Sequence, residues 1–245
     1  MARHRDRETS SDSDGSARTP LDNIFLRAPR EKRTGSSLTR ESIVDAAVRL
    51  LDTEGADALT MRRLAGALGV HATSLYWYVD RREDLVDLAV DRVLADAAAD
   101  DAGGDDWESA ITRTARSMYA AFVRHSWVAG FAASRPLLGP NAVALSARIL
   151  AALASTGASE RHRAVAATTI SNLILGGAAA AAGAAALGVD DPDSPLAREI
   201  VARVSAAEAP PPSLTTWTSF FDDSLALVMV GVRDLLADGD DVSAT

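Results

Sequence analysis

The residues of this sequence that could do chemistry gather in one run, LTMRRLAGALGVHATSLYWYV, at positions 59–79. Its arginines, hydroxyls and aromatic rings are groups that bind DNA, because they reach phosphates and base edges and pack on sugars and thymine methyls. The apolar spacing predicts two short helices joined at Gly69, since glycine ends a helix in the left-handed conformation without a Cβ penalty. Thr60 is expected to cap the first helix, because its hydroxyl can accept a hydrogen bond from a backbone N–H of the opening turn.

The second helix of this run is expected to expose its aromatic side chains. At about 100° per residue, Leu75 and Val79 fall together on the inward face, while Thr73 and Trp77 point the opposite way with Tyr76 beside them. Aromatic rings offered to water are unusual, and a DNA groove would explain them. The alternative interpretation is that the run only completes a small three-helix core.

Motifs for catalysis or metal binding are missing from the sequence. Its histidines, at positions 4, 71, 125 and 162, show no metal-ligand spacing, and there is no GxSxG, P-loop or GxGxxG motif. The absence of cysteine excludes disulfides and thiolate metal sites, and it suits a reducing cytoplasm. The N-terminal residues are polar and Arg-rich, so no signal peptide is expected. We therefore expect a cytoplasmic protein that is not an enzyme and that uses neither a cofactor nor a metal.

The pattern of the whole chain is that of an all-α protein, because no alternating strand pattern occurs. Helices are expected at about 39–53, 81–99, 107–122, 127–133, 140–155, 159–187, 195–208 and 213–237. They predict three parts: a disordered basic arm (1–37), a three-helix helix-turn-helix DNA-binding domain (38–84) and a helical ligand-binding and dimerisation domain (85–245). The most apolar stretch, 173–189, consists of alanine interrupted by glycine, which favours a packed interior helix over a membrane span.

The net charge of −9 is unusual for a DNA-binding protein until it is divided along the chain. Residues 1–82 hold 14 Lys and Arg against 12 Asp and Glu, whereas the remainder holds 11 against 22. The acidity therefore belongs to the second domain, and basic residues of the first are left to meet phosphates. These residues are Arg30, Lys32, Arg33, Arg40, Arg62, Arg63, Arg81 and Arg82.

Residues 38–97 resemble the N-terminal domain of the tetracycline-repressor (TetR) family of transcription regulators. The shared features are an amphipathic first helix, the EG turn at 54–55, the LTMRRLA opening, the LGV turn, the SLYWYV recognition helix and the DLV start of the next helix. The resemblance implies a ligand-responsive regulator, usually a repressor, that binds a palindromic operator in double-stranded DNA as a homodimer. A small hydrophobic molecule would act as its inducer. The alternatives are a transcriptional activator and a ligand-sensing dimer that acts through a protein partner.

Within such a DNA-binding domain, called the reader below (residues 38–84), Arg62 is the leading candidate for a base contact, because arginine can bond O6 and N7 of guanine together. Thr73 and Tyr78 come next, and Arg33 of the arm could enter the minor groove. Ala72 offers only a methyl contact where other family members carry an amide side chain. The residues expected to hold phosphates are Thr60, Ser74, Tyr76, Trp77 and Arg82.

The resemblance also implies a ligand cavity in the second domain. Suitable groups are Arg116, Tyr119, His125, Trp127, Phe131 and Asn172, although each could equally belong to the core. His125 falls where tetracycline-binding members carry a drug-contacting histidine, but the second such histidine aligns with about Ala98, so magnesium-tetracycline is not predicted. The long small-residue helix and the last helix are expected to form the dimer interface; the alternative is that they pack only within one chain.

Overall fold

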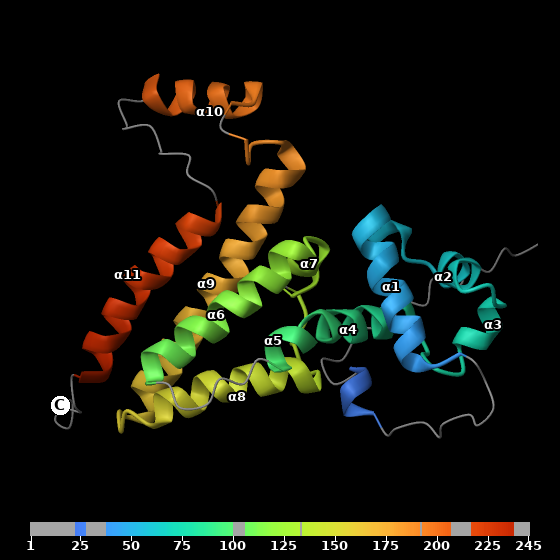
Figure 1. Cartoon of the computed structure of the whole chain (residues 1–245), viewed down its shortest axis with the longest axis horizontal. Helices are drawn as coiled ribbons and strands as arrows, with labels where there is room; N and C mark the ends of the chain where they lie inside the picture. Colours follow the sequence, from blue (N-terminus) through green and yellow to red (C-terminus); the bar gives the residue numbers. More distant parts are fainter. Residues whose placement is uncertain are drawn as a thin grey trace, which may run out of the picture.

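The computed structural model describes residues 23–27, 38–99, 106–132, 134–191, 193–206 and 217–237. Within these ranges every regular element is a helix, which confirms the all-α prediction. Helices α1 to α3 lie at one end of the elongated molecule, and α6 to α11 form the body at the other end (Figure 1). The segment α4–α5 runs between the two parts, so it is the element through which they are joined.

The first part begins with α1 (Arg40–Glu54), which a capping box starts, because the side chains of Thr39 and Ser42 each accept a hydrogen bond from the other's backbone N–H. The short helix η2 (Ala56–Ala58), α2 (Met61–Ala67) and α3 (Ala72–Leu75) follow. Gly69 has a φ of 67°, so it makes the predicted left-handed turn between α2 and α3. The buried residues that hold these helices together are Ile43, Ala47, Leu51, Leu64 and Leu75.

The connecting segment, predicted as one helix over 81–99, is two helices in the structure. These are α4 (Arg82–Val93) and α5 (Ala95–Ala99), with Leu94 at the turn between them. α4 packs against α1 on one side and α8 on the other. Arg92 of α4 is exposed and donates to Asp45 of α1 at 2.9 Å. The buried polar residues of α4 are three aspartates, Asp84, Asp87 and Asp91.

The body consists of longer helices packed around one core. They are α6 (Trp107–Arg124), α7 (Trp127–Ala132), α8 (Pro140–Ala154), α9 (Glu160–Leu187), α10 (Pro195–Ala206) and α11 (Trp217–Ala237). α9 lies at the centre, since it packs against α6, α7, α8 and α11. α10 stands apart from the bundle, at the top of Figure 1.

α9 is the helix of the described residues that is long and apolar enough to cross a membrane. One side of it is packed within the bundle, where Ile170, Ile174 and Ala178 are at most 1% exposed. Small side chains and glycines cover much of the other side. Only 28% of its most apolar window is buried, so the alanine-rich helix expected in the interior is packed along one side only.

Residues 23–27 lie within the arm expected to be disordered, but they are ordered against the body of the protein. They form η1 (Ile24–Leu26), which Asn23 caps by accepting from the backbone N–H of Phe25 at 3.0 Å. η1 packs against α4, and Ile24 contacts the core. The expectation of disorder therefore does not hold for these residues. The rest of the arm, including Arg30, Lys32 and Arg33, lies outside the described residues.

Candidate nucleic-acid interface and effector site

The α2–α3 pair presents exposed polar and aromatic side chains at the end of the molecule opposite α11 (Figure 1). Trp77 is 66% exposed and Tyr76 is 49% exposed, whereas Leu75 and Val79 are almost completely buried, as the helical spacing predicted. The recognition helix is shorter than expected, because α3 ends at Leu75. The backbone N–H of Val79 still bonds the Leu75 carbonyl, so the following turn keeps its direction.

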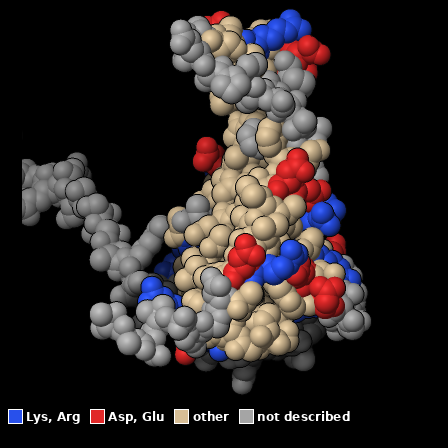
Figure 2. All heavy atoms as spheres, turned by 90° about the vertical axis from the view of Figure 1, so that its left-hand side faces the viewer, with Lys and Arg blue, Asp and Glu red and all other residues tan. Residues whose placement is uncertain are grey.

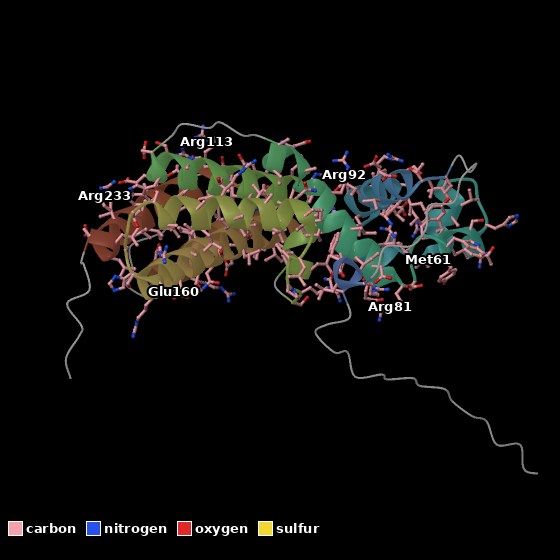
Figure 3. The ribbon with its side chains drawn as sticks, turned by 90° about the horizontal axis from the view of Figure 1, so that it is seen from below. Met61, Arg81, Arg92, Arg113, Glu160 and Arg233 are labelled. Atoms are coloured by element: carbon pink, nitrogen blue, oxygen red, sulfur yellow. The ribbon has the colours of Figure 1, made fainter. Side chains whose placement is uncertain are left out.

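Arg62 lies in the first turn of α2, next in sequence to Met61, which Figure 3 labels. It is exposed and makes no hydrogen bond or ion pair with any residue that the structure describes. Thr60 caps α2 by accepting from the backbone N–H of Arg63 at 3.2 Å. The other expected contact residues of α3 also lie here: Thr73 is exposed, and Ala72 and Ser74 are half-buried.

Two residues expected to touch DNA also hold the first part of the fold together. The Tyr78 hydroxyl donates to the Leu38 carbonyl at 2.6 Å. The Arg82 guanidinium donates to the carbonyls of Ala56 and Leu59 at 2.7 and 2.8 Å. These bonds use the Tyr78 hydroxyl as a donor and two of the five N–H groups of Arg82, so a base contact from Tyr78 and a phosphate contact from Arg82 stay predictions.

The other basic residues expected at phosphates that the structure describes are also engaged within the chain. Arg40 donates to the Tyr78 carbonyl at 3.2 Å, and Arg63 pairs with Glu54. Arg81 lies 3.8 Å from the carboxylate of Asp84. Arg62 therefore differs from Arg40, Arg63 and Arg81. Its guanidinium makes no hydrogen bond or ion pair with the described residues, so it is available to bind another molecule.

The residues expected to bind a ligand do not converge on one cavity. Arg116 is exposed and donates to Asp222 of α11 at 2.8 Å. Tyr119 is buried, and its ring stacks on Phe221 with the centroids 3.8 Å apart. Asn172 lies exposed on α9. Two of these side chains thus serve contacts between α6 and α11.

His125 and Trp127 join the body to α1 through Asp52. The carboxylate of Asp52 accepts from Trp127 Nε1 at 2.7 Å, and the same oxygen lies 2.8 Å from His125 Nδ1. The Trp127 ring also meets Phe131 edge to face. His125 is therefore a hydrogen-bonded residue between the two parts of the fold, which the sequence left open as the alternative to a ligand contact.

A small cavity lies where α4 meets the loop before α8, and of the six expected ligand residues only Phe131 lines it. Its apolar walls include Phe25, Val86, Val90, Phe131, Leu137 and Ala142, and its polar walls are Asn23, Asp87, Asp91 and Arg135. The cavity touches α4, which leads directly to the reader. A molecule bound there would contact α4 and the loop before α8. This contact region, which links the two parts of the fold, is called the joint below.

Two of the three buried aspartates of α4, Asp87 and Asp91, attach it to the body. Arg135 donates two hydrogen bonds to Asp87, at 2.7 and 2.6 Å, and this pairing raises the pKa of the Arg135 guanidinium. Asp91 accepts from the backbone N–H groups of Asn141 and Ala142, at 2.9 and 3.0 Å, at the start of α8. Burial raises the pKa of Asp91, although these hydrogen bonds oppose the rise. Sequence reasoning missed this row, whose signal is aspartates spaced by three and four residues along one helix, so that they share a face.

Comparison with known proteins places both parts in one family. Residues 43–89 match the model described as "Bacterial regulatory proteins, tetR family", and residues 100–236 match "Tetracyclin repressor-like, C-terminal domain". Among curated proteins, the chain is 39% identical over 149 residues to an HTH-type transcriptional regulator of Saccharopolyspora erythraea. That alignment covers 61% of this chain and 63% of the relative. The chain is also 37% identical over 125 residues to the HTH-type transcriptional repressor DrrR1 of Streptomyces coeruleorubidus, covering 51% of this chain and 46% of DrrR1.

Solved structures agree over a longer part of the chain. The fold is similar to that of ActR from Streptomyces coelicolor in complex with actinorhodin, with a TM-score of 0.65 and 27% sequence identity. The match covers 83% of this chain and all of that one. The similarity therefore extends across the reader and the body together.

Proposed function

Because this chain belongs to the TetR family of bacterial transcription regulators, we propose that it is a ligand-responsive repressor that binds a palindromic operator as a homodimer. Like its named relatives, it is a transcription regulator and not an enzyme. The observation that carries the proposal is the surface of α2 and α3. There Arg62 is available to an outside partner, beside aromatic rings that the core does not cover.

The proposed DNA contacts are those whose side chains face outward from the reader. Arg62 would bond a guanine edge, and Trp77 would pack on sugars and thymine methyls. Arg33 would reach the minor groove from the arm. The remaining proposed contacts are Thr60, Ala72, Thr73, Ser74 and Tyr76.

A homodimer is supported by the outward face of α11. Leu227 is 74% exposed, Val230 49% and Phe220 38%, although the opposite face of the same helix is buried in the body. Figure 2 views the molecule from this side and shows a largely uncharged band, with charged residues mostly along its margin. Exposed apolar surface of this kind is what an isologous partner covers. Two-fold symmetry would also set the readers on half-sites one helical turn, about 34–36 Å, apart.

We propose a small, mostly aromatic or hydrophobic molecule as the inducer. The relative bound to actinorhodin supports this class, because its fold matches most of this chain. The cavity beside α4 has apolar walls with a few polar groups, but it is small, so an aromatic inducer would enter it only if the helices around it moved apart. The protein would act in the cytoplasm, where its operator is.

Release of DNA would follow from the position of α4. A ligand that binds better to a conformer with mis-spaced readers must lower operator affinity, and operator DNA must lower ligand affinity equally. Such couplings typically amount to about 1–3 kcal/mol.

The proposal is tested by a gel shift with the DNA upstream of the gene, repeated with a panel of aromatic drugs and metabolites. We expect a shift whose midpoint weakens as salt rises, and at least one compound that reverses it. Salt-independent retention, or no shift at any ionic strength, would favour a dimer that works through a protein partner. Reporter assays with the same DNA separate repression from activation.

A further inference from the structure

The short segment Asn23–Arg27 contacts both parts of the fold. Its helix η1 packs on α4, and Figure 3 shows it beside Arg81, where the chain leaves the reader. Asn23 and Phe25 line the cavity beside α4, together with residues of the loop that leads into α8. A segment that precedes the reader in sequence therefore lies between the reader and the body.

Arg27 makes the ion pairs that hold this segment against the rest of the protein. Its Nη1 lies 2.8 Å from the carboxylate of Asp80, in the loop between α3 and α4, and its Nη2 pairs with the carboxylate of Asp84 in the first turn of α4. Arg27 thus bridges the loop that follows the exposed aromatic residues and the helix that leads to the body.

Asp84 is the centre of the bridge. Its side chain is 1% exposed, and its second oxygen accepts from the backbone N–H groups of Asp80 and Arg81 at 3.0 and 3.2 Å. A buried carboxylate is costly unless a cation and hydrogen bonds compensate for lost water. Arg27 supplies the closer cation, because Arg81 is 3.8 Å away. The path of the chain from reader to α4 is therefore fixed around one carboxylate that depends on Arg27.

The segment is held by more than this ion pair. Asn23 is 3% exposed and caps η1, and Ile24 packs against the core. Loss of the Arg27 side chain should therefore loosen the loop at Asp80 without releasing the whole segment.

We propose that Arg27 is a positioning residue for the DNA reader: it fixes the loop after the recognition helix through Asp80 and Asp84, and so sets the angle of the reader against the body. This inference rests on the proposed function, since the readout is operator binding. It adds that a segment upstream of the helix-turn-helix domain is part of the joint.

Charge provides the decisive test, because Asp80→Asn and Arg27→Ala break the same contact with opposite changes in charge. If Arg27 acts only through its charge near DNA, Arg27→Ala weakens operator binding and Asp80→Asn strengthens it. If Arg27 positions the loop, both substitutions weaken binding. We expect about a tenfold rise in Kd for Arg27→Ala, the equivalent of one charged hydrogen bond, and a smaller rise for Asp80→Asn.

The full-length variants are compared at one salt concentration with Arg27→Lys and Arg203→Ala. Arg27→Lys should recover part of the affinity. Arg203→Ala, which removes an ion pair with Glu199 within α10, should match the wild type. Amide exchange should rise over residues 78–85 in Arg27→Ala while the α9 amides stay protected. Tighter binding by Asp80→Asn, or wild-type affinity and exchange in both variants, would overturn the inference. Failure of the wild-type protein to bind its upstream DNA would instead overturn the proposed function.

Discussion

Asp87 on α4 and Arg135 in the loop before α8 form an ion pair through two hydrogen bonds, at 2.7 and 2.6 Å. The side chains are only 6% and 22% exposed, so the pair is largely shielded from water. Together with the contact of Asp91 to the start of α8, it attaches the connecting helix to the body on one face. These contacts tie the position of α4 to that of the loop before α8 and the start of α8.

Replacing one member of this pair should be costly. Arg135→Ala leaves the Asp87 carboxylate buried without its cation, and we expect a loss of about 3 kcal/mol in the free energy of unfolding. Urea unfolding followed by circular dichroism measures the loss. The control is Arg203→Ala, whose exposed pair with Glu199 should contribute less than about 0.5 kcal/mol. Equal effects of the two substitutions would mean that the buried pair does not attach α4.

Asp91 should give the protein a specific pH dependence. Burial raises its pKa above the ordinary 3.8, so the folded protein holds this proton at pH values where the unfolded chain has lost it. The contribution of Asp91 to stability is therefore full below pH 3.8 and is lost as pH rises through the raised pKa. The difference in unfolding free energy between wild type and Asp91→Ala should shrink across that interval and then stay constant. A difference that grows with pH there would contradict this account.

Two glycines should respond oppositely to alanine. At Gly139, the residue that precedes α8, a Cβ would overlap the side chain of Asp91, so Gly139→Ala should lower stability by about 1–3 kcal/mol. At Gly66, in α2, a Cβ meets nothing within 4 Å, so Gly66→Ala should raise stability by up to about 1 kcal/mol. Thermal unfolding of the two variants and the wild type measures both changes in stability. A neutral Gly139→Ala would show that α4 and α8 are not packed so closely.

The proposed dimer can be tested without DNA. Leu227→Glu places a charge on the outward face of α11, and we expect it to shift the protein from dimer to monomer in analytical ultracentrifugation. Leu150→Glu on α8, at a position that is also exposed, should leave the dimer intact. If both variants remain dimeric, the interface lies elsewhere; if the wild type is a monomer, the proposal fails.

Local patterns predicted the helices well because each depends on neighbouring residues. The starts of α1 and α2 and the turn between α2 and α3 fall where they were predicted, since Thr39, Thr60 and Gly69 act on the backbone beside them. The break at Leu94 was not predicted, because no glycine or proline marks it and it comes from packing.

Contacts between distant segments were much harder to predict. The exposed face with Trp77 followed from helical spacing, but the engagement of Arg82 depends on carbonyls of a loop more than twenty residues away in sequence. His125 was assigned to a ligand by resemblance, whereas its partner is Asp52 on α1. Composition alone cannot tell whether a polar side chain meets a ligand or another part of the chain.

The most direct test of the central claim is the affinity of wild-type and Arg62→Ala proteins for the upstream DNA, measured by fluorescence anisotropy at one low salt concentration. Arg62 is exposed and has no partner among the described residues, so its removal should not disturb the fold or the dimer. We expect saturable, competitor-resistant binding by the wild type, and at least about a tenfold weaker Kd for Arg62→Ala, since a bidentate base contact contributes about 1–3 kcal/mol. Equal affinity of the two proteins for that DNA would contradict the role assigned to the α2–α3 surface.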